Sequence, residues 1–445
     1  GSKKSERISD IIIHPTDSNT VWAAVQGPLW TGGGERGLYK TTDGGETWKQ
    51  VLKPENEWTG VTSLLIDPSN PDKLYAATWS RQRKIGVYVG TGPAAGIHTS
   101  DDGGETWTKL KKGLPKGNMG KIGLAISPIN PDIVYATIET DNRGGGFYRS
   151  ANRGASWTKV SDEVGGGTGP HYYQEIFADQ HKLDRVYIAS NYSKVSDDGG
   201  KTWTPISTRR KHVDDHAFAF HPTDPDFVLI GSDGGIYMTH DRMENFRFIG
   251  NLPLTQFYKV APDDSYPFYN VYAGAQDNNT QGGPSQTRKT EGIANADWSI
   301  TLGGDGHGPA VEPGNPDIMY SQWQQGNLTR RDLKTRENVY IKPQPRPGEP
   351  AERYNWDAPV NVSSHDPKRV YFASQRVWRS DDRGDSWTPV SGDLTKDGNR
   401  MHQKVMGRTW SVEAGWDIYA MTEFHTIANF SESPVDENVL WTGSD

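Results

Sequence analysis

A short polar motif that recurs along the chain constrains its fold more than any other feature. Each copy ends in an aromatic residue, and the tryptophans at 48, 107, 157 and 203 follow one another at intervals of about 45 to 60 residues. This spacing is typical of propeller blades. The copies are TTDGGETW from Thr41, SDDGGETW from Ser100, SANRGASW from Ser150, SDDGGKTW from Ser196 and SDDRGDSW from Ser380, with an eroded copy, THDRMENF, from Thr239.

Two predicted strands precede each motif. A first strand ends in His-Pro or Asp-Pro, a turn rich in Asn, Pro and Asp follows, and a second strand comes next, as in LLIDPSNPDKLYAAT from Leu64. With the strands on either side of the motif, each repeat supplies four strands. Because one such sheet cannot bury both faces alone, the sequence predicts an all-β propeller of four-stranded antiparallel blades.

Every position of the motif has a structural reason. Aspartates such as Asp102 can accept hydrogen bonds from the N–H groups of their own turn, the glycines permit positive φ, and the tryptophan can pack between blades. The motif resembles the Asp-box, or bacterial neuraminidase repeat, of sialidases, sortilin-type receptors and xyloglucan hydrolases. This resemblance implies that the motif lies at the outer end of each blade without catalytic residues, so the binding site is expected at the opposite rim.

The resemblance extends over the chain from Ile8 onward, to large exported bacterial proteins described as sortilin-like or glycosyl-hydrolase-like. It implies a location outside the cell, in the periplasm or at the cell surface, and a two-ring or ten-bladed array. We interpret residues 1–7 as a cloning scar or a disordered start and residues 8–445 as eight or nine blade starts. The last start lacks its hairpin, so a further chain or segment is expected to complete the propeller.

Composition excludes several classes of function. The formal charge is -8, from 56 acidic and 48 basic residues, and no Lys/Arg stripe is present, which argues against nucleic acid. No apolar run approaches eighteen residues, so no membrane span is predicted. Zero cysteines exclude disulfides and thiolate metal sites. Signatures of serine hydrolases, zinc proteases and nucleotide enzymes are missing, and no cofactor is expected.

Two aspartates are the candidate catalytic residues. In a propeller, the loops before the innermost strands converge on the axial funnel. Asp215, in RRKHVDDHAFAF from Arg209, and Asp305, in GGDGHGPAV from Gly303, stand before predicted strands of this kind. If they share a pocket, they supply the acid and base that glycoside hydrolysis needs. The alternative is that both cap turns and bind loop amides.

The same loops supply the candidate ligand contacts. Tyr172, Tyr173 and Trp356 are platforms for sugar rings or inter-blade packing residues, and Arg81 and Arg83 could bind carboxylates. The turn at 277–279 offers oxygens that calcium accepts but lacks an EF-type spacing, so no metal site is predicted. The candidate ligand-binding residues are Arg81, Arg83, Tyr172, Tyr173, His216, Gln276, Asp277, Asn278, His307 and Trp356.

The sequence thus predicts an exported Asp-box propeller that binds a polymer in its axial funnel, with carbohydrate as the first ligand class and glycoside hydrolysis left open. Two carboxyl groups about 5 to 9.5 Å apart in a cleft would favour hydrolysis. The alternatives are a sortilin-like peptide- or protein-binding propeller, favoured by a funnel of edge strands, and a structural module of a surface assembly.

Overall fold

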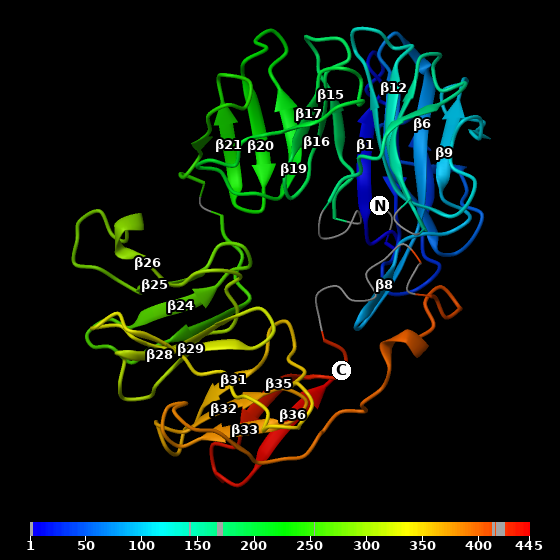
Figure 1. Ribbon diagram of the computed structural model, residues 1–445. Helices are drawn as coiled ribbons and strands as arrows, with labels where there is room; N and C mark the ends of the chain where they lie inside the picture. Colours follow the sequence, from blue (N-terminus) through cyan, green and yellow to red (C-terminus); the bar gives the residue numbers. More distant parts are fainter. Residues whose placement is uncertain (1–2, 142–143, 167–171, 253, 412–413, 415–422) are drawn as a thin grey trace. The chain divides into compact units, whose positions relative to one another are not determined.

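The structure is a computed structural model that describes residues 3–141, 144–166, 172–252, 254–411, 414 and 423–445. Within these residues the protein consists of eight four-stranded antiparallel sheets, two two-stranded sheets and the short 3-10 helices η2 (Asn295–Asp297) and η3 (Arg400–His402). No helix in this part of the chain is long and apolar enough to cross a bilayer. The predicted all-β fold of four-stranded antiparallel blades is confirmed (Figure 1).

The chain forms two compact units. Unit 1 comprises Gly1–Asn251 and Met401–Ala420, and unit 2 comprises Leu252–Arg400 and Met421–Asp445. Unit 1 holds five four-stranded sheets. They are β1 (Ile8–Ile13), β2 (Val21–Val25), β3 (Gly37–Thr41) and β4 (Lys49–Leu52); β5 (Thr59–Asp67), β6 (Asn70–Ser80), β9 (Gly96–Ser100) and β10 (Thr108–Lys109); β11 (Met119–Ile126), β12 (Val134–Thr140), β13 (Gly146–Ser150) and β14 (Thr158–Ser161); β15 (Ile176–Ala178), β16 (Val186–Ile188), β17 (Lys194–Ser196) and β18 (Thr204–Pro205); and β19 (Asp215–Phe220), β20 (Val228–Ser232), β21 (Gly235–Thr239) and β22 (Arg247–Phe248).

The apolar core of unit 1 lies between consecutive sheets. Trp22 and Leu38 of the first sheet pack with Leu64 and Leu74 of the second, and equivalent clusters join the second to the third, the third to the fourth and the fourth to the fifth. The alternating apolar residues of the second strands, Val-Tyr-Ala-Ala in type, supply much of this packing because both faces of those strands are covered. The sheets therefore stack face to face like blades.

The hairpins that carry the repeated motif, which we call boxes, have the predicted hydrogen bonds. Asp102 accepts from the Thr106 N–H (2.9 Å) and the Thr106 hydroxyl (2.5 Å), and Gly104 N–H donates to the Ser100 hydroxyl (2.9 Å). These bonds hold the pKa of Asp102 well below its usual range. Trp157 is buried in the core shared by the second and third sheets, which confirms that a box tryptophan packs between blades.

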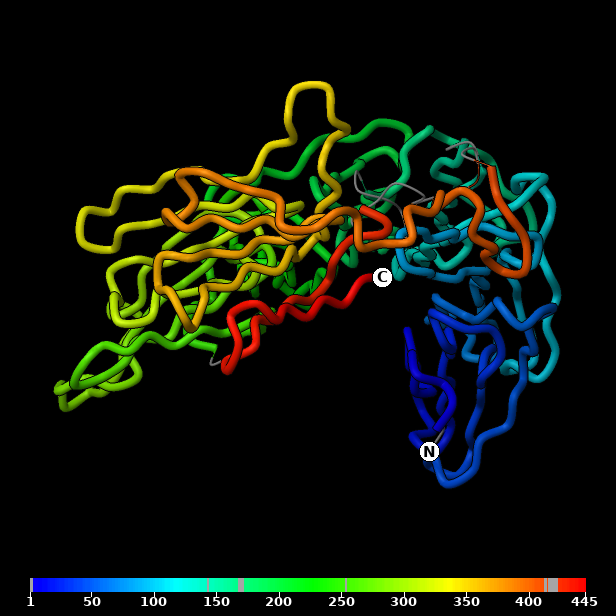
Figure 2. Tube along the Cα trace, turned by 90° about the horizontal axis from the view of Figure 1, so that it is seen from below, coloured from blue at the N-terminus to red at the C-terminus, as the bar shows by residue number. Residues whose placement is uncertain are grey.

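A segment far along the chain completes unit 1. The hairpin of β7 (Gln82–Lys84) and β8 (Val87–Val89) is inserted between β6 and β9. Val87 and Val89 form a small apolar cluster with Val405, Met406 and Trp410. Figure 2 shows the backbone of this late segment, in orange, beside the blue strands of unit 1. The Met406 N–H donates to the Gln82 side-chain oxygen at 2.5 Å, and the Gln403 amide donates to the Ile85 carbonyl at 2.9 Å. We call residues 401–411 the clasp.

Unit 2 repeats the blade architecture with three four-stranded sheets and one hairpin. They are β23 (Lys259–Pro262), β24 (Asn270–Gly274), β25 (Thr280–Pro284) and β26 (Ser299–Leu302); β27 (Ala310–Val311), β28 (Ile318–Trp323), β29 (Asn327–Asp332) and β30 (Asn338–Tyr340); β31 (Val360–Val362), β32 (Val370–Ala373), β33 (Val377–Ser380) and β34 (Thr388–Pro389); and β35 (Ile427–Glu432) with β36 (Leu440–Ser444). Tyr320 and Leu328 pack with Val370 and Phe372 between successive sheets.

Candidate functional site

The first strand of each four-stranded sheet is an edge strand, and its beginning is the region where the sequence predicted ligand contacts. We call these beginnings, with the loops that precede them, the leading ends. In unit 2, the strands β23, β27 and β31 contact one another in order. Their leading ends carry Tyr258 and Lys259, then Asp305 and His307, and then Trp356 and Asp357. The contacts between these strands bring the three pairs of side chains together.

We call Tyr258, Lys259, Asp305, His307 and Asp357 the Asp305 cluster. Its glycine-rich loop is tied to the turn at 275–279, because Gly306 N–H donates to the Ala275 carbonyl (3.1 Å) and Asn279 N–H donates to the Gly304 carbonyl (3.1 Å). A Cβ on Gly274 would lie 1.8 Å from the His307 carbonyl oxygen, and one on Gly306 would lie 2.3 Å from that of Asn279. Only glycine allows this close approach of the two backbones.

His307 is the centre of this cluster. Its side chain is completely buried, stacked on Tyr258 with ring centres 4.9 Å apart, and edge-on to Trp356 at 5.9 Å. Among the described residues, neither ring nitrogen has a hydrogen-bond partner, although Nδ1 lies 3.9 Å from the Asp357 carboxylate. Burial lowers the pKa of His307. The ring is therefore a neutral, polar group whose hydrogen-bonding capacity is unused, which is costly in a purely structural residue.

Two carboxyl groups flank His307 and have different partners. The Lys259 ammonium lies 2.9 Å from Asp357, and Gly308 N–H donates to the same carboxylate at 3.4 Å. Asp305 is 9% exposed and accepts one long hydrogen bond, from Asp277 N–H at 3.3 Å, but forms no ion pair with a lysine or arginine of the described chain. Burial raises the pKa of Tyr258, and the charges of both carboxylates raise it further.

The turn at 275–279 lies beside this cluster. The Tyr258 hydroxyl donates to the Gln276 side-chain oxygen, and the Asn278 amide donates to the Gln276 carbonyl at 3.0 Å. Gly304 N–H donates to the Asn279 side-chain oxygen at 3.2 Å. Six of the candidate site residues therefore gather in unit 2: Gln276, Asp277, Asn278, Asp305, His307 and Trp356.

In unit 1, a hollow of about 820 Å³ lies along the first strands of all five sheets. At its leading ends, the Lys121 ammonium lies 2.7 Å from one oxygen of Glu175, and His216 Nε2 lies 2.9 Å from Asp233. His216 also stacks on the Tyr173 ring at 5.1 Å. The contact with Asp233 raises the pKa of His216.

Asp215 and His216 are adjacent in β19 and have different environments. His216 lines the hollow, whereas Asp215 is 1% exposed and pairs with the Lys211 ammonium at 2.5 Å and the Ser193 hydroxyl at 2.6 Å. Asp215 thus belongs to unit 1 with a buried ion pair of its own, and Asp305 belongs to unit 2.

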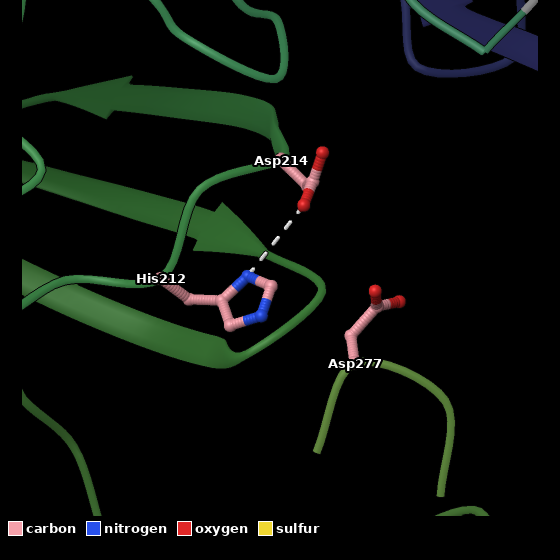
Figure 3. A group of neighbouring side chains, drawn as sticks. All are labelled: His212, Asp214 and Asp277. Atoms are coloured by element: carbon pink, nitrogen blue, oxygen red, sulfur yellow. Dashed lines mark ion pairs between the residues drawn. The ribbon is translucent and has the colours of Figure 1, made fainter. Parts of the chain in front are cut away.

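The neighbouring residues of the same loop support the sheet. Asp214 accepts hydrogen bonds from the Tyr173 hydroxyl (2.7 Å) and the Asn191 amide (2.5 Å), and His212 Nδ1 lies 3.8 Å from it (Figure 3). Asp277, also drawn there, belongs to unit 2. Tyr172 stands edge-on to Tyr173 at 6.4 Å, so these two aromatic residues pack against each other.

The two arginines predicted to bind carboxylates lie elsewhere in unit 1: Arg81 joins β6 to β7, and Arg83 lies in β7. Arg81 is 7% exposed and stacks on Trp79 at 4.9 Å, and Arg83 stands over Trp30 at 5.8 Å. Burial lowers the pKa of Arg81. Both guanidinium groups therefore lie over tryptophan rings in this structure.

Several residues of these sites were missed by sequence reasoning. Tyr258, Lys259 and Asp357 complete the Asp305 cluster, and Lys121 and Glu175 complete the leading end of the hollow. These residues share one feature that the sequence could have shown: each lies in, or shortly before, the first strand of a sheet. Lysine and glutamate are frequent on surfaces, however, so position alone did not distinguish them.

Comparisons with known proteins found one family model and several xyloglucanases that are similar to parts of this chain. The family described as "Sortilin, neurotensin receptor 3" matches residues 145–290. A probable oligoxyloglucan-reducing end-specific xyloglucanase of Neosartorya fischeri is 26% identical over 52% of this chain and 29% of its own length. A xyloglucanase of Acetivibrio thermocellus is 28% identical over 46% of this chain and 26% of its own. The chain therefore spans less than a third of the length of these relatives.

Solved structures with similar architecture include a xyloglucanase from Xanthomonas campestris, which is 12% identical, with a TM-score of 0.42 over 88% of this chain and 65% of that one. PorZ, a surface component of the type-IX secretion system of Porphyromonas gingivalis, is 14% identical with a TM-score of 0.42, over 87% of this chain and 47% of that one.

Proposed function

We propose that this protein binds a polysaccharide and cleaves its glycosidic bonds at the Asp305 cluster of unit 2. The observation that carries the proposal is the placement of two carboxyl groups, Asp305 and Asp357, around one buried, unsatisfied histidine between aromatic rings. Sugar rings stack on aromatic faces, and the Tyr258 ring of this cluster is 43% exposed. The relatives named as xyloglucanases support a glucan backbone as the first substrate to test.

The different partners of the two carboxyl groups suit different roles. Asp357 is held by Lys259 and suits the base, which removes a proton from the attacking water. Asp305, which lacks a cationic partner in the described chain, suits the acid, which gives its proton to the leaving glycosidic oxygen. Water is added across the bond, and the two carboxyl groups exchange their protonation states, which solvent then restores.

The test is release of reducing ends from xyloglucan, cellulose and mixed-linkage glucans. Asp305→Asn and Asp357→Asn should each lower turnover by about 100-fold or more, since each removes one proton-transfer step. Asp385→Asn is the matched control, because Asp385 is an exposed carboxylate of unit 2 that pairs with Arg330 at the box end. Full turnover in both site variants, or equal loss in the control, would contradict the proposal.

A further inference from the structure

The hollow of unit 1 has a repeated feature that the proposed function does not use. Four of its five first strands carry one extra residue relative to the neighbouring strand, and each β-bulge lies at the leading end. The extra residues are Ser9 in β1, Thr62 in β5, one residue at Gly120–Lys121 in β11, and His216 in β19. A bulge redirects a side chain and interrupts regular pairing.

The bulged positions supply polar residues to the hollow. Ser9, Thr62, Lys121 and His216 all line it, and Gln174 and Glu175, just before β15, complete the fifth side. Gln174 has a φ of 102°, which is a strained conformation for a residue other than glycine. Polar residues line the hollow at all five leading ends, four of which carry a bulge, and packing does not require them because the apolar parts of the same strands already form the inter-sheet cores.

Three of these residues have unused hydrogen-bonding capacity. The Thr62 hydroxyl, the Gln174 amide nitrogen and one carboxylate oxygen of Glu175 are buried without a partner among the described residues. They offer a hydroxyl, a donor and an acceptor respectively. Buried polar atoms left unpaired cost free energy, so a ligand that pairs them is favoured.

The charged side chains at the leading ends of the hollow form ion pairs, and the Asp10 carboxylate, which also lines it, accepts a hydrogen bond from the Leu64 N–H at 3.1 Å. Lys121 pairs with the other oxygen of Glu175, and His216 pairs with Asp233. A strongly charged ligand would have to break these pairs, whereas an uncharged ligand rich in hydroxyls would not. The bulges also disrupt the regular edge that an added peptide strand would need, which disfavours a peptide in the same place.

We propose that the bulged leading ends of unit 1 form a second binding site, which takes a neutral sugar chain without cleaving it. The ligand hydroxyls pair with Thr62, Gln174 and Glu175, and the apolar lining packs against the sugar ring faces. The identity of the ligand rests on the proposed function, but the site lies in unit 1 and contains none of the residues of the Asp305 cluster.

The test uses the full chain with the Asp305 cluster disabled by Asp305→Asn and Asp357→Asn. Calorimetry with neutral glucan oligosaccharides should still show binding, and Thr62→Val with Glu175→Gln should weaken it at least about tenfold. Glu163→Gln is the matched control, because Glu163 pairs with Lys194 at 2.9 Å in the same unit. If the chain with the disabled cluster binds no oligosaccharide, the proposal is overturned. It is also overturned if the substitutions in the hollow leave binding unchanged, even where the wild type cleaves glucan.

A second measurement does not depend on substitutions. Hydrogen exchange of the wild type with saturating oligosaccharide should show protection at residues 60–66, 119–126 and 174–178. Protection confined to unit 2, or protection by peptides but not by glycans, overturns the proposal. If residual binding and protection appear without any cleavage, the proposed function fails and the unit 1 site stands.

Discussion

The two ends of the blades differ in how fully their polar atoms are satisfied. At the box end, Asp102 and its equivalents accept hydrogen bonds from their own turns, and the box tryptophan NH donates to a carbonyl, as Trp107 does to Gly104 at 3.0 Å. At the leading ends, His307, Thr62 and Glu175 keep buried polar atoms without partners in the described chain. Satisfied networks stabilise a fold, whereas unsatisfied ones are expected where a ligand binds.

The largest effect on stability is expected from a substitution at the box end. Trp157→Ala should remove about 3 to 5 kcal/mol from the free energy of unfolding of unit 1, because Trp157 is 4% exposed and fills the core between two sheets. Urea denaturation followed by circular dichroism measures the loss. Glucan cleavage by the folded variant should be unchanged. A variant of wild-type stability would show that the box is not a wedge between the blades.

An intermediate effect is expected on the pH dependence of stability, in which the leading-end histidines His216 and His307 should differ. Contact with Asp233 raises the pKa of His216, so its contribution to stability is full below the unfolded pKa of about 6.5 and is lost as pH rises through the folded value. Burial lowers the pKa of His307, so its contribution is full above about pH 6.5 and is lost as pH falls.

The loss of unfolding free energy caused by His216→Gln and by His307→Gln should therefore change in opposite directions between pH 5.5 and pH 8. The substitution at 216 should cost more at pH 5.5, and the one at 307 should cost more at pH 8. NMR titration of the two rings gives their pKa values directly. Glu175 and Lys121 also act on His216, and Asp305, Asp357 and Lys259 act on His307, so parallel responses would contradict the different environments assigned here.

The smallest effect is expected from a substitution that converts one form of the box into another. Arg153, at φ 55°, occupies the box position that Gly103 fills at φ 69°, and its guanidinium reaches Asp132 at 2.8 Å. Gly103→Arg should change the free energy of unfolding by only about 1 kcal/mol, because a new ion pair with Asp72 partly offsets the strained φ. Thermal melts test this, with Gly103→Ala, which has no ion pair to gain, as the more destabilised control.

The box end was predictable from sequence and the leading ends only in part. Repeats of Asp, Gly and Trp define local turns, so their hydrogen bonds follow from residue spacing. Asp305 and His307 were found because a loop with four glycines differs from the repeat. The β-bulges at Thr62 and His216 were not found, because one extra residue in a strand depends on the register with its neighbour. The roles of Lys259 and Asp357 also depend on how separate loops meet.

The clasp has a consequence for how the chain folds during synthesis. Val87 and Val89 emerge from the ribosome more than three hundred residues before Val405, Met406 and Trp410, which cover them. Until the clasp arrives, the β7–β8 hairpin exposes an apolar surface that other chains could contact, and long-range closure of this kind is slow. A nascent chain is therefore most vulnerable to aggregation before residue 410 is translated, and a chaperone that shields the hairpin would raise the yield of native protein.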